Sequence, residues 1–231
     1  MIPRLKSLFF MIGFWSPTLW AEMVFDSQLV EVDIKPGQDE VIASFPFVIK
    51  GEDEKIVGME VFCSCVGDPR VEPLNPDRSP KLNWKVGDKG VIKLKMETAQ
   101  FLGTVEKGAG LKLHGREELV KLTIRVNIPE LIKLVPNNLK WDLGAATDQK
   151  TARILVKHDK PIKIVQHKGR NTEVFPYELV TIREGWEYEI RVKPTSTAMA
   201  GLGLISLQTD SEFPRFKRVA VYATVRRNLT R

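Results

Sequence analysis

The feature that most constrains the fold is an alternation of apolar and polar residues with a period of two. It is plain in Leu29–Ile34 and again in Val91–Met96. An extended strand turns successive side chains to opposite faces, so this period predicts strands with one buried face. After Glu22 the sequence has no segment with the period of an amphipathic helix. The chain is therefore predicted to be all-β.

The predicted strands follow one another closely and are separated by Gly, Pro, Asp and Asn, a pattern typical of a β-sandwich or barrel. Those of the first half are Leu29–Ile34, Val41–Ile49, Ile56–Cys65, Val91–Met96 and Leu119–Ile128. Those of the second half are residues 139–144, 150–157, 162–165, 177–182, 186–192, 202–209 and 218–225.

Proline and glycine punctuate these strands. Pro46 lies inside the second predicted strand and indicates a sheet edge or a bend there, because proline has no backbone N–H to donate. The segments Gly108–Gly110 and Gly201–Gly203 are interpreted as hairpin turns, since they lack the lysine and the downstream helix of a phosphate-binding loop.

The chain divides near Leu131–Pro136, which follows Pro129 and precedes an Asn-Asn turn. Each half has about 100 residues and is long enough to bury its own core. We predict a signal peptide over residues 1–21, a first β-sandwich over 22–128 and a second over 129–228.

The N-terminus has the three-part layout of a secretory signal peptide. Arg4 and Lys6 form a basic head, Leu8–Trp20 is almost wholly apolar, and Ala21 is a small residue at the expected cleavage point. The apolar part is shorter than the about 20 residues that span a bilayer. We predict a periplasmic or secreted protein with no transmembrane segment after signal removal; the alternative is an N-terminal element buried in the fold.

The charge balance argues against a nucleic-acid partner. The formal net charge is +6, and the part beyond residue 21 holds 33 basic and 29 acidic residues, or +4. Charges of both signs alternate, whereas nucleic-acid binding requires clustered basic stripes with aromatic platforms. The nearest candidate cluster, to which we assign no role, is Arg215, Lys217, Arg218, Arg226, Arg227 and Arg231.

The two cysteines, Cys63 and Cys65, form the motif that carries chemistry. On a straight strand their side chains would point to opposite faces, so both can bind one metal only if the backbone turns, as Gly67–Pro69 allows. Four interpretations stay open: a disulfide between them, a redox-active pair, a copper(I) site with Met59 or Met96, or a bond to another chain. A disulfide here would close a small, strained ring that is easily reduced.

The sequence has no recognisable catalytic set. His114, His158 and His167 are scattered, and no local motif pairs any of them with a nucleophile. We therefore predict that the protein is not an enzyme and has no resident cofactor, apart from the copper considered above.

The segment Gly58–Val66 resembles a family of exported bacterial immunoglobulin-like domains of unknown function, which carry a Cys-Gly-Cys-Thr motif after a strand. Cys63-Ser64-Cys65-Val66 takes the motif position, and Lys85–Gly90 takes the position of the turn that follows it. Ser64 and Val66 replace the glycine and threonine of the family.

The second half is similar to the companion domains of that family. Leu139–Gly144 matches their opening strand, and Thr209-Asp210 matches a late corner. The resemblance implies two tandem immunoglobulin-like β-sandwich domains and export, but no activity.

Taken together, these features predict a non-enzymatic structural or interaction protein of the cell envelope. A protein partner would bind at strand edges, end loops or the domain junction, and nucleic acid is not expected. The alternative is a copper-binding or thiol-redox module that uses Cys63 and Cys65.

Overall fold

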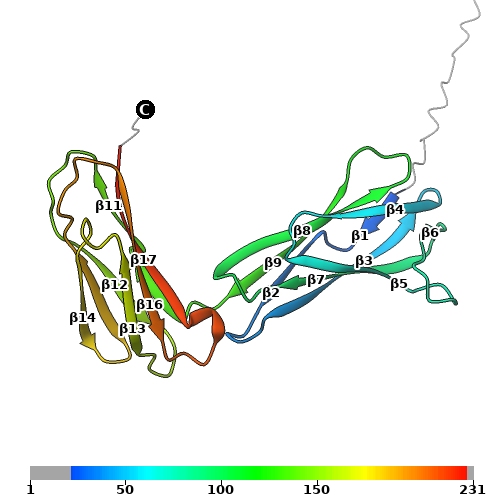
Figure 1. Ribbon diagram of the computed structural model, residues 1–231. Helices are drawn as coiled ribbons and strands as arrows, with labels where there is room; N and C mark the ends of the chain where they lie inside the picture. The colour runs from blue at the N-terminus through cyan, green and yellow to red at the C-terminus, as the bar shows by residue number, and fades with distance from the viewer. Residues whose placement is uncertain (1–21, 228–231) are drawn as a thin grey trace, which may run out of the picture.

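The computed structural model describes residues 22–227, which form two β-sandwiches (Figure 1). Four sheets pack in pairs around two hydrophobic cores. The first core draws its residues from Met23 to Ile128, and the second from Leu131 to Val225. The all-β prediction is confirmed, while the predicted signal peptide lies outside the described residues.

The first sandwich pairs a four-stranded sheet with a five-stranded one. The four-stranded sheet has the order β1 (Glu22–Phe25), β3 (Glu40–Lys50), β7 (Lys89–Glu97), β5 (Val66–Glu72). The five-stranded sheet has the order β2 (Leu29–Asp33), β9 (Val120–Ile128), β8 (Gly103–Leu113), β4 (Glu54–Val61), β6 (Asn83–Trp84). Alternate residues of each long strand are buried, as the period of two requires.

The second sandwich has two four-stranded sheets. One has the order β10 (Ile132–Val135), β12 (Lys150–Val156), β15 (Glu187–Val192), β14 (Tyr177–Arg183). The other has the order β11 (Asn138–Asp142), β17 (Arg218–Arg226), β16 (Gly201–Thr209), β13 (Ile164–Arg170). A short 3₁₀ helix, η1 (Pro214–Phe216), joins β16 to β17.

A tryptophan anchors each core. Trp84 is 1% exposed, meets the ring of Phe47 edge-on at 4.8 Å, and donates its indole N–H to the carbonyl of Lys81. Trp141 is 2% exposed and donates its indole N–H to the carbonyl of Asp148. Each ring therefore fills its core without leaving its one polar group unsatisfied.

An early strand lies parallel to the last strand in both sandwiches. β2 pairs with β9, and β11 pairs with β17, each over five residue pairs. The other strand pairs of the described chain are antiparallel. The second strand and the last strand of each sandwich are thus neighbours in one sheet.

The interpretation of the two glycine segments as hairpin turns is wrong. Gly108 and Gly110 lie in the middle of β8, and Gly203 lies in β16. A Cβ on Gly108 would overlap the carbonyl oxygen of Leu122, and one on Gly203 would lie 2.8 Å from the ring of Phe175. These glycines are needed because a neighbouring strand or ring approaches the backbone closely.

The interpretation of Pro46 as an edge holds locally: β3 lies between β1 and β7, but β1 pairs with Phe47–Lys50 and stops there, so the β1 side of β3 has no ladder pair from Pro46 back to Glu40. Asp26 donates its backbone N–H to the carbonyl of Pro46 at 3.1 Å, so the backbone of Pro46 faces the end of β1. β1 stops at Phe25, and the missing N–H of Pro46 therefore breaks no long ladder.

The two sandwiches touch where η1 meets the loop between β2 and β3 (Figure 1). Arg215 donates from Nη2 to the carbonyl of Gln38 at 2.7 Å and to the carboxylate of Asp39 at 3.0 Å. Its side chain is 2% exposed, so this cation is enclosed at the junction. Within residues 22–227, no helix is long and apolar enough to cross a membrane.

Candidate functional site

The predicted cysteine site lies in the turn between β4 and β5, where the chain crosses from one sheet of the first sandwich to the other. Strand β4 ends at Val61, so the predicted strand Ile56–Cys65 is too long at its C-terminal end. A disulfide joins Cys63 and Cys65, whose Cα atoms are 5.2 Å apart. The backbone turns there, and both cysteines pack against the first core.

Backbone hydrogen bonds fix this turn to the neighbouring strand. Val66 donates its N–H to the carbonyl of Cys63 at 3.1 Å, and Glu97 donates to the carbonyl of Cys65 at 2.8 Å. Cys65 also donates its N–H to Sγ of Cys63 at 3.0 Å. Cys65 is buried, whereas Ser64 is exposed.

The sulfur ligands proposed for copper lie in the same region. Met96 is wholly buried and is paired with Val66 in the β5–β7 ladder, and Met59 packs against the same core. Over residues 22–227, no group of three or more His, Cys, Asp and Glu side chains could hold a metal. Copper(I) binding by Cys63 and Cys65 requires thiolates, so it would require reduction of the disulfide.

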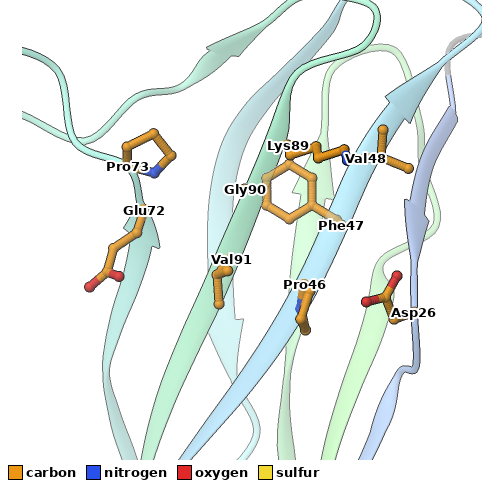
Figure 2. A pocket seen from close by; sticks show the side chains of 9 residues that line it. All are labelled: Asp26, Pro46, Phe47, Val48, Glu72, Pro73, Lys89, Gly90 and Val91. Atoms are coloured by element: carbon orange, nitrogen blue, oxygen red, sulfur yellow. The ribbon is translucent and has the colours of Figure 1, made fainter.

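A second candidate site is a hollow on the outer face of the β1-β3-β7-β5 sheet, shown in Figure 2. Its volume is about 640 Å³. Pro46 and Val48 of β3 and Val91 of β7 form an apolar floor, because alternate residues of both strands face outward. The rim is formed by Asp26, Glu72, Pro73 and Lys89.

Phe47 and Gly90 also line the hollow, from its core side. Phe47 lies between Pro46 and Val48, and its ring turns into the core against Phe25 and Trp84. A Cβ on Gly90 would lie 2.5 Å from both the Phe47 and the Trp84 rings, so only glycine fits at this point of β7. The apolar floor therefore lies directly over a rigid aromatic cluster.

An apolar floor with a charged rim suits the anchoring side chain of a protein partner. Interface cores are apolar and depleted in charge, and their rims are polar. Here the rim carries both signs, with Asp26 and Glu72 as anions and Lys89 as the cation. The alternation in the sequence indicates that Pro46 and Val48 share a face, but it does not reveal that Glu72 and Val91 lie beside them.

Farther along the same sheet face the charges neutralise one another. A hollow that includes Ile42 and Ser44 is lined by three cations and three carboxylates. The three ion pairs are Arg70–Asp68 at 2.5 Å, Lys93–Glu72 at 2.7 Å and Lys95–Glu40 at 2.6 Å. The hydrogen bond from Arg70 lowers the pKa of Asp68, and the one to Glu40 raises the pKa of Lys95.

The structure scatters the other residues considered from the sequence. In the basic C-terminal run, Arg215 is enclosed at the junction, Arg218 is exposed on β17, and Arg231 lies outside the described residues. The ring of His158 meets that of Phe213 edge-on, and His167 Nδ1 lies 2.9 Å from the Tyr177 hydroxyl.

No protein-family model and no curated protein matches this chain. Similar solved structures exist. Domains 5–6 of the S-layer protein SbsC share 11% identity over 90% of this chain and 99% of that chain, with a TM-score of 0.28. The titin Ig tandem A164–A165 shares 10% identity over 90% of this chain and 98% of that chain, with a TM-score of 0.30.

A further match, the VesB protease of Vibrio cholerae, shares 14% identity over 46% of this chain, with a TM-score of 0.35. The chain spans only 31% of that protease. At such identities the likenesses concern the fold alone. The strand orders β1-β3-β7-β5 with β2-β9-β8-β4-β6, and β10-β12-β15-β14 with β11-β17-β16-β13, follow the immunoglobulin-like arrangement of two facing sheets. The chain therefore has two tandem immunoglobulin-like β-sandwich domains.

Proposed function

We propose that this protein is a non-enzymatic interaction protein of the cell envelope, located in the periplasm or secreted. It binds a protein partner through the hollow of Figure 2, with an apolar side chain of the partner on the floor formed by Pro46, Val48 and Val91. The observation that carries the proposal is this apolar floor inside a charged rim, in a domain whose fold serves many binding functions.

Two further features support the proposal. The signal-peptide pattern of residues 1–21 favours export. The disulfide of Cys63 and Cys65 suits an oxidising compartment. Membership in the exported family that Cys63–Val66 resembles stays a prediction, as does the absence of enzymatic turnover.

Site-specific crosslinking in the producing cell tests the partner site. A photoreactive amino acid replaces Val48 in the full-length chain, and crosslinked partners are identified by mass spectrometry. We expect a defined protein adduct, and we expect Val91→Glu to remove it, because a carboxylate would then lie on the apolar floor.

The matched control places the same photoreactive group at Val57, which is 44% exposed on β4 in the opposite sheet. An adduct at position 48 that persists in Val91→Glu, or that position 57 reproduces, would contradict a partner site in this hollow. Fractionation of the same cells, with the N-terminal mass of the mature chain, tests export and cleavage after Ala21.

The copper or thiol-redox alternative centres on Cys63 and Cys65. Metal analysis and thiol counting on the exported protein, with and without reductant, separate the two functions. An inert disulfide without metal leaves the interaction role in place, whereas stoichiometric copper on the reduced pair, lost in the Cys63→Ser and Cys65→Ser double variant, would move the function to this turn.

A further inference from the structure

The outer face of the β11-β17-β16-β13 sheet in the second sandwich holds a second, different hollow of about 310 Å³. Its polar lining includes Gln166, Lys168 and Arg170 of β13, Ser206 and Gln208 of β16, and Arg218 of β17. Among residues 22–227, no Asp or Glu lines it. Three cations therefore converge on one sheet face, and the rest of the lining is two amides, a hydroxyl, His167 and Leu204.

These cations have no carboxylate partners. Lys168, Arg170 and Arg218 are exposed, and none of them takes part in an ion pair within residues 22–227. A surface with one sign of charge attracts a ligand of the opposite sign and raises its rate of association. The hollow is thus suited to an anionic ligand.

The strand that carries two of the cations is also a sheet edge, because in the part of the chain that the structure describes β13 pairs with β16 alone. Thr209 donates its backbone N–H to the carbonyl of Lys217, on the β17 side of β16. Backbone groups alternate in direction along a strand, so the N–H and C=O groups of Gln208, Ser206 and Leu204 point toward β13. Their partners in the ladder are Gln166, Lys168 and Arg170.

The residues between those partners turn their backbone groups away from β16. His167 and Gly169 therefore present N–H and C=O groups along the free edge of β13, with no strand partner among the described residues. An added peptide strand satisfies such groups with a regular ladder, which a glycan or a phosphate chain cannot do.

The spacing of the charges fits the same ligand. Lys168 and Arg170 are two residues apart on one face of a strand, about 6.6–6.8 Å along its axis. Alternate side chains of a paired peptide have the same spacing and lie directly opposite, within reach of a salt bridge. Arg218 lies across β16, opposite Gln208, and extends the positive field over the sheet.

We propose that this face binds an acidic segment of a partner protein in extended conformation, added as a strand at the edge of β13. Carboxylates at alternate positions of the segment face Lys168 and Arg170, and its backbone pairs with His167 and Gly169. This site is separate from the hollow of Figure 2, which lies in the other sandwich.

The test is a fluorescence-anisotropy titration of the full-length chain with a labelled ten-residue peptide in which Glu alternates with Thr and Val. We expect the triple variant Lys168→Gln, Arg170→Gln, Arg218→Gln to weaken binding by about tenfold or more. A control triple variant with the same change in net charge, Lys50→Gln, Lys112→Gln, Lys121→Gln, alters exposed lysines of the first sandwich and should bind within about twofold of the wild type.

Amide hydrogen exchange followed by NMR tests the edge itself. Peptide binding should slow exchange at His167 and Gly169, because their N–H groups enter a ladder. The proposal is overturned by equal binding of the charge triple variant, by unchanged exchange at both amides, or by equal affinity for inorganic polyphosphate or for a peptide with its glutamates in one block. Val91→Glu should bind the acidic peptide as the wild type does, so failure at one site leaves the other proposal intact.

Discussion

Two hollows, one on the outer face of a sheet in each sandwich, are each lined by three cations. On the β1-β3-β7-β5 sheet, Arg70, Lys93 and Lys95 each have a carboxylate partner. On the β11-β17-β16-β13 sheet, Lys168, Arg170 and Arg218 have neutral neighbours instead. The net charge of a face therefore says little about what it binds. What matters is whether each cation already has a carboxylate partner or is available to a ligand.

We call the outer face of the β1-β3-β7-β5 sheet the first face and that of the β11-β17-β16-β13 sheet the second face. The largest effect is expected from a carboxylate placed on the second face. Ser206 lies directly opposite Lys168 in the β13–β16 ladder, so Ser206→Glu gives that lysine an internal partner. Affinity for the alternating acidic peptide should fall by about tenfold. Anisotropy titrations measure it, with Ser206→Gln as the control of similar size; equal losses in both variants would mean that bulk, and not charge, is responsible.

Removing carboxylates from the first face should allow it to bind the acidic peptide weakly. Glu40→Gln with Glu72→Gln leaves Lys93 and Lys95 without their ion-pair partners. The double variant should gain measurable affinity for the same peptide, about fivefold weaker than the second face at low salt. It should stay weaker because β5, the edge strand of this sheet, is interrupted by a register shift between Gly67 and Arg70. No gain at all would show that charge alone does not separate the two faces.

Added salt should weaken peptide binding at the second face by a smaller factor, and it should hardly change stability through the ion pairs of the first face. Raising the ionic strength from about 0.05 to about 0.3 M should weaken peptide binding at the second face several-fold, because the Debye length shortens. The thermal unfolding midpoint should hardly change, because exposed ion pairs such as Arg70–Asp68 contribute little to stability. Calorimetry and titration on one preparation test both; salt-independent binding would contradict an electrostatic site.

Low pH should produce the smallest effect, a loss of stability that involves Asp68 on the first face. The pKa of Asp68 is lowered from 3.8, chiefly by the hydrogen bond from Arg70, so its contribution to stability is present above that value and is lost as the pH falls through the lowered pKa. Asp68→Asn keeps the positive φ of 49° that Asn tolerates. Urea unfolding at about pH 7 and pH 3 should show a slightly smaller acid loss in the variant than in the wild type; an equal loss would assign the acid sensitivity to other carboxylates.

Much of the fold could be predicted from alternation, and the failures have physical causes. Strands with one buried face, such as β7 and β17, have a strict period of two and were found. Strand β8 was missed because Gly108 and Gly110 resemble turn residues, although they are required by close contact with β9 and Phe62. Strand β13 was placed too early, since most of its residues are exposed and its edge position removes the pattern.

The sites were less predictable than the fold. Cys63 and Cys65 could be found from sequence because they lie one residue apart and are chemically distinctive. The hollow of Figure 2 combines β3, β5 and β7, and the basic face combines β13 with β17, so both depend on strand order that no local pattern encodes. The basic run at the C-terminus was misleading in this respect, since Arg215 serves the junction while Arg218 joins residues about 50 positions earlier.

The parallel pairing of the second and last strands of each sandwich has a mechanical consequence. If the chain is stretched by its ends, β2 and β9 are pulled in opposite directions along their axes, and so are β11 and β17. The bonds across each pair are then loaded together in shear, and cannot open one after another as in a hairpin peeled from its end. Both sandwiches are thus arranged to resist tension along the molecule.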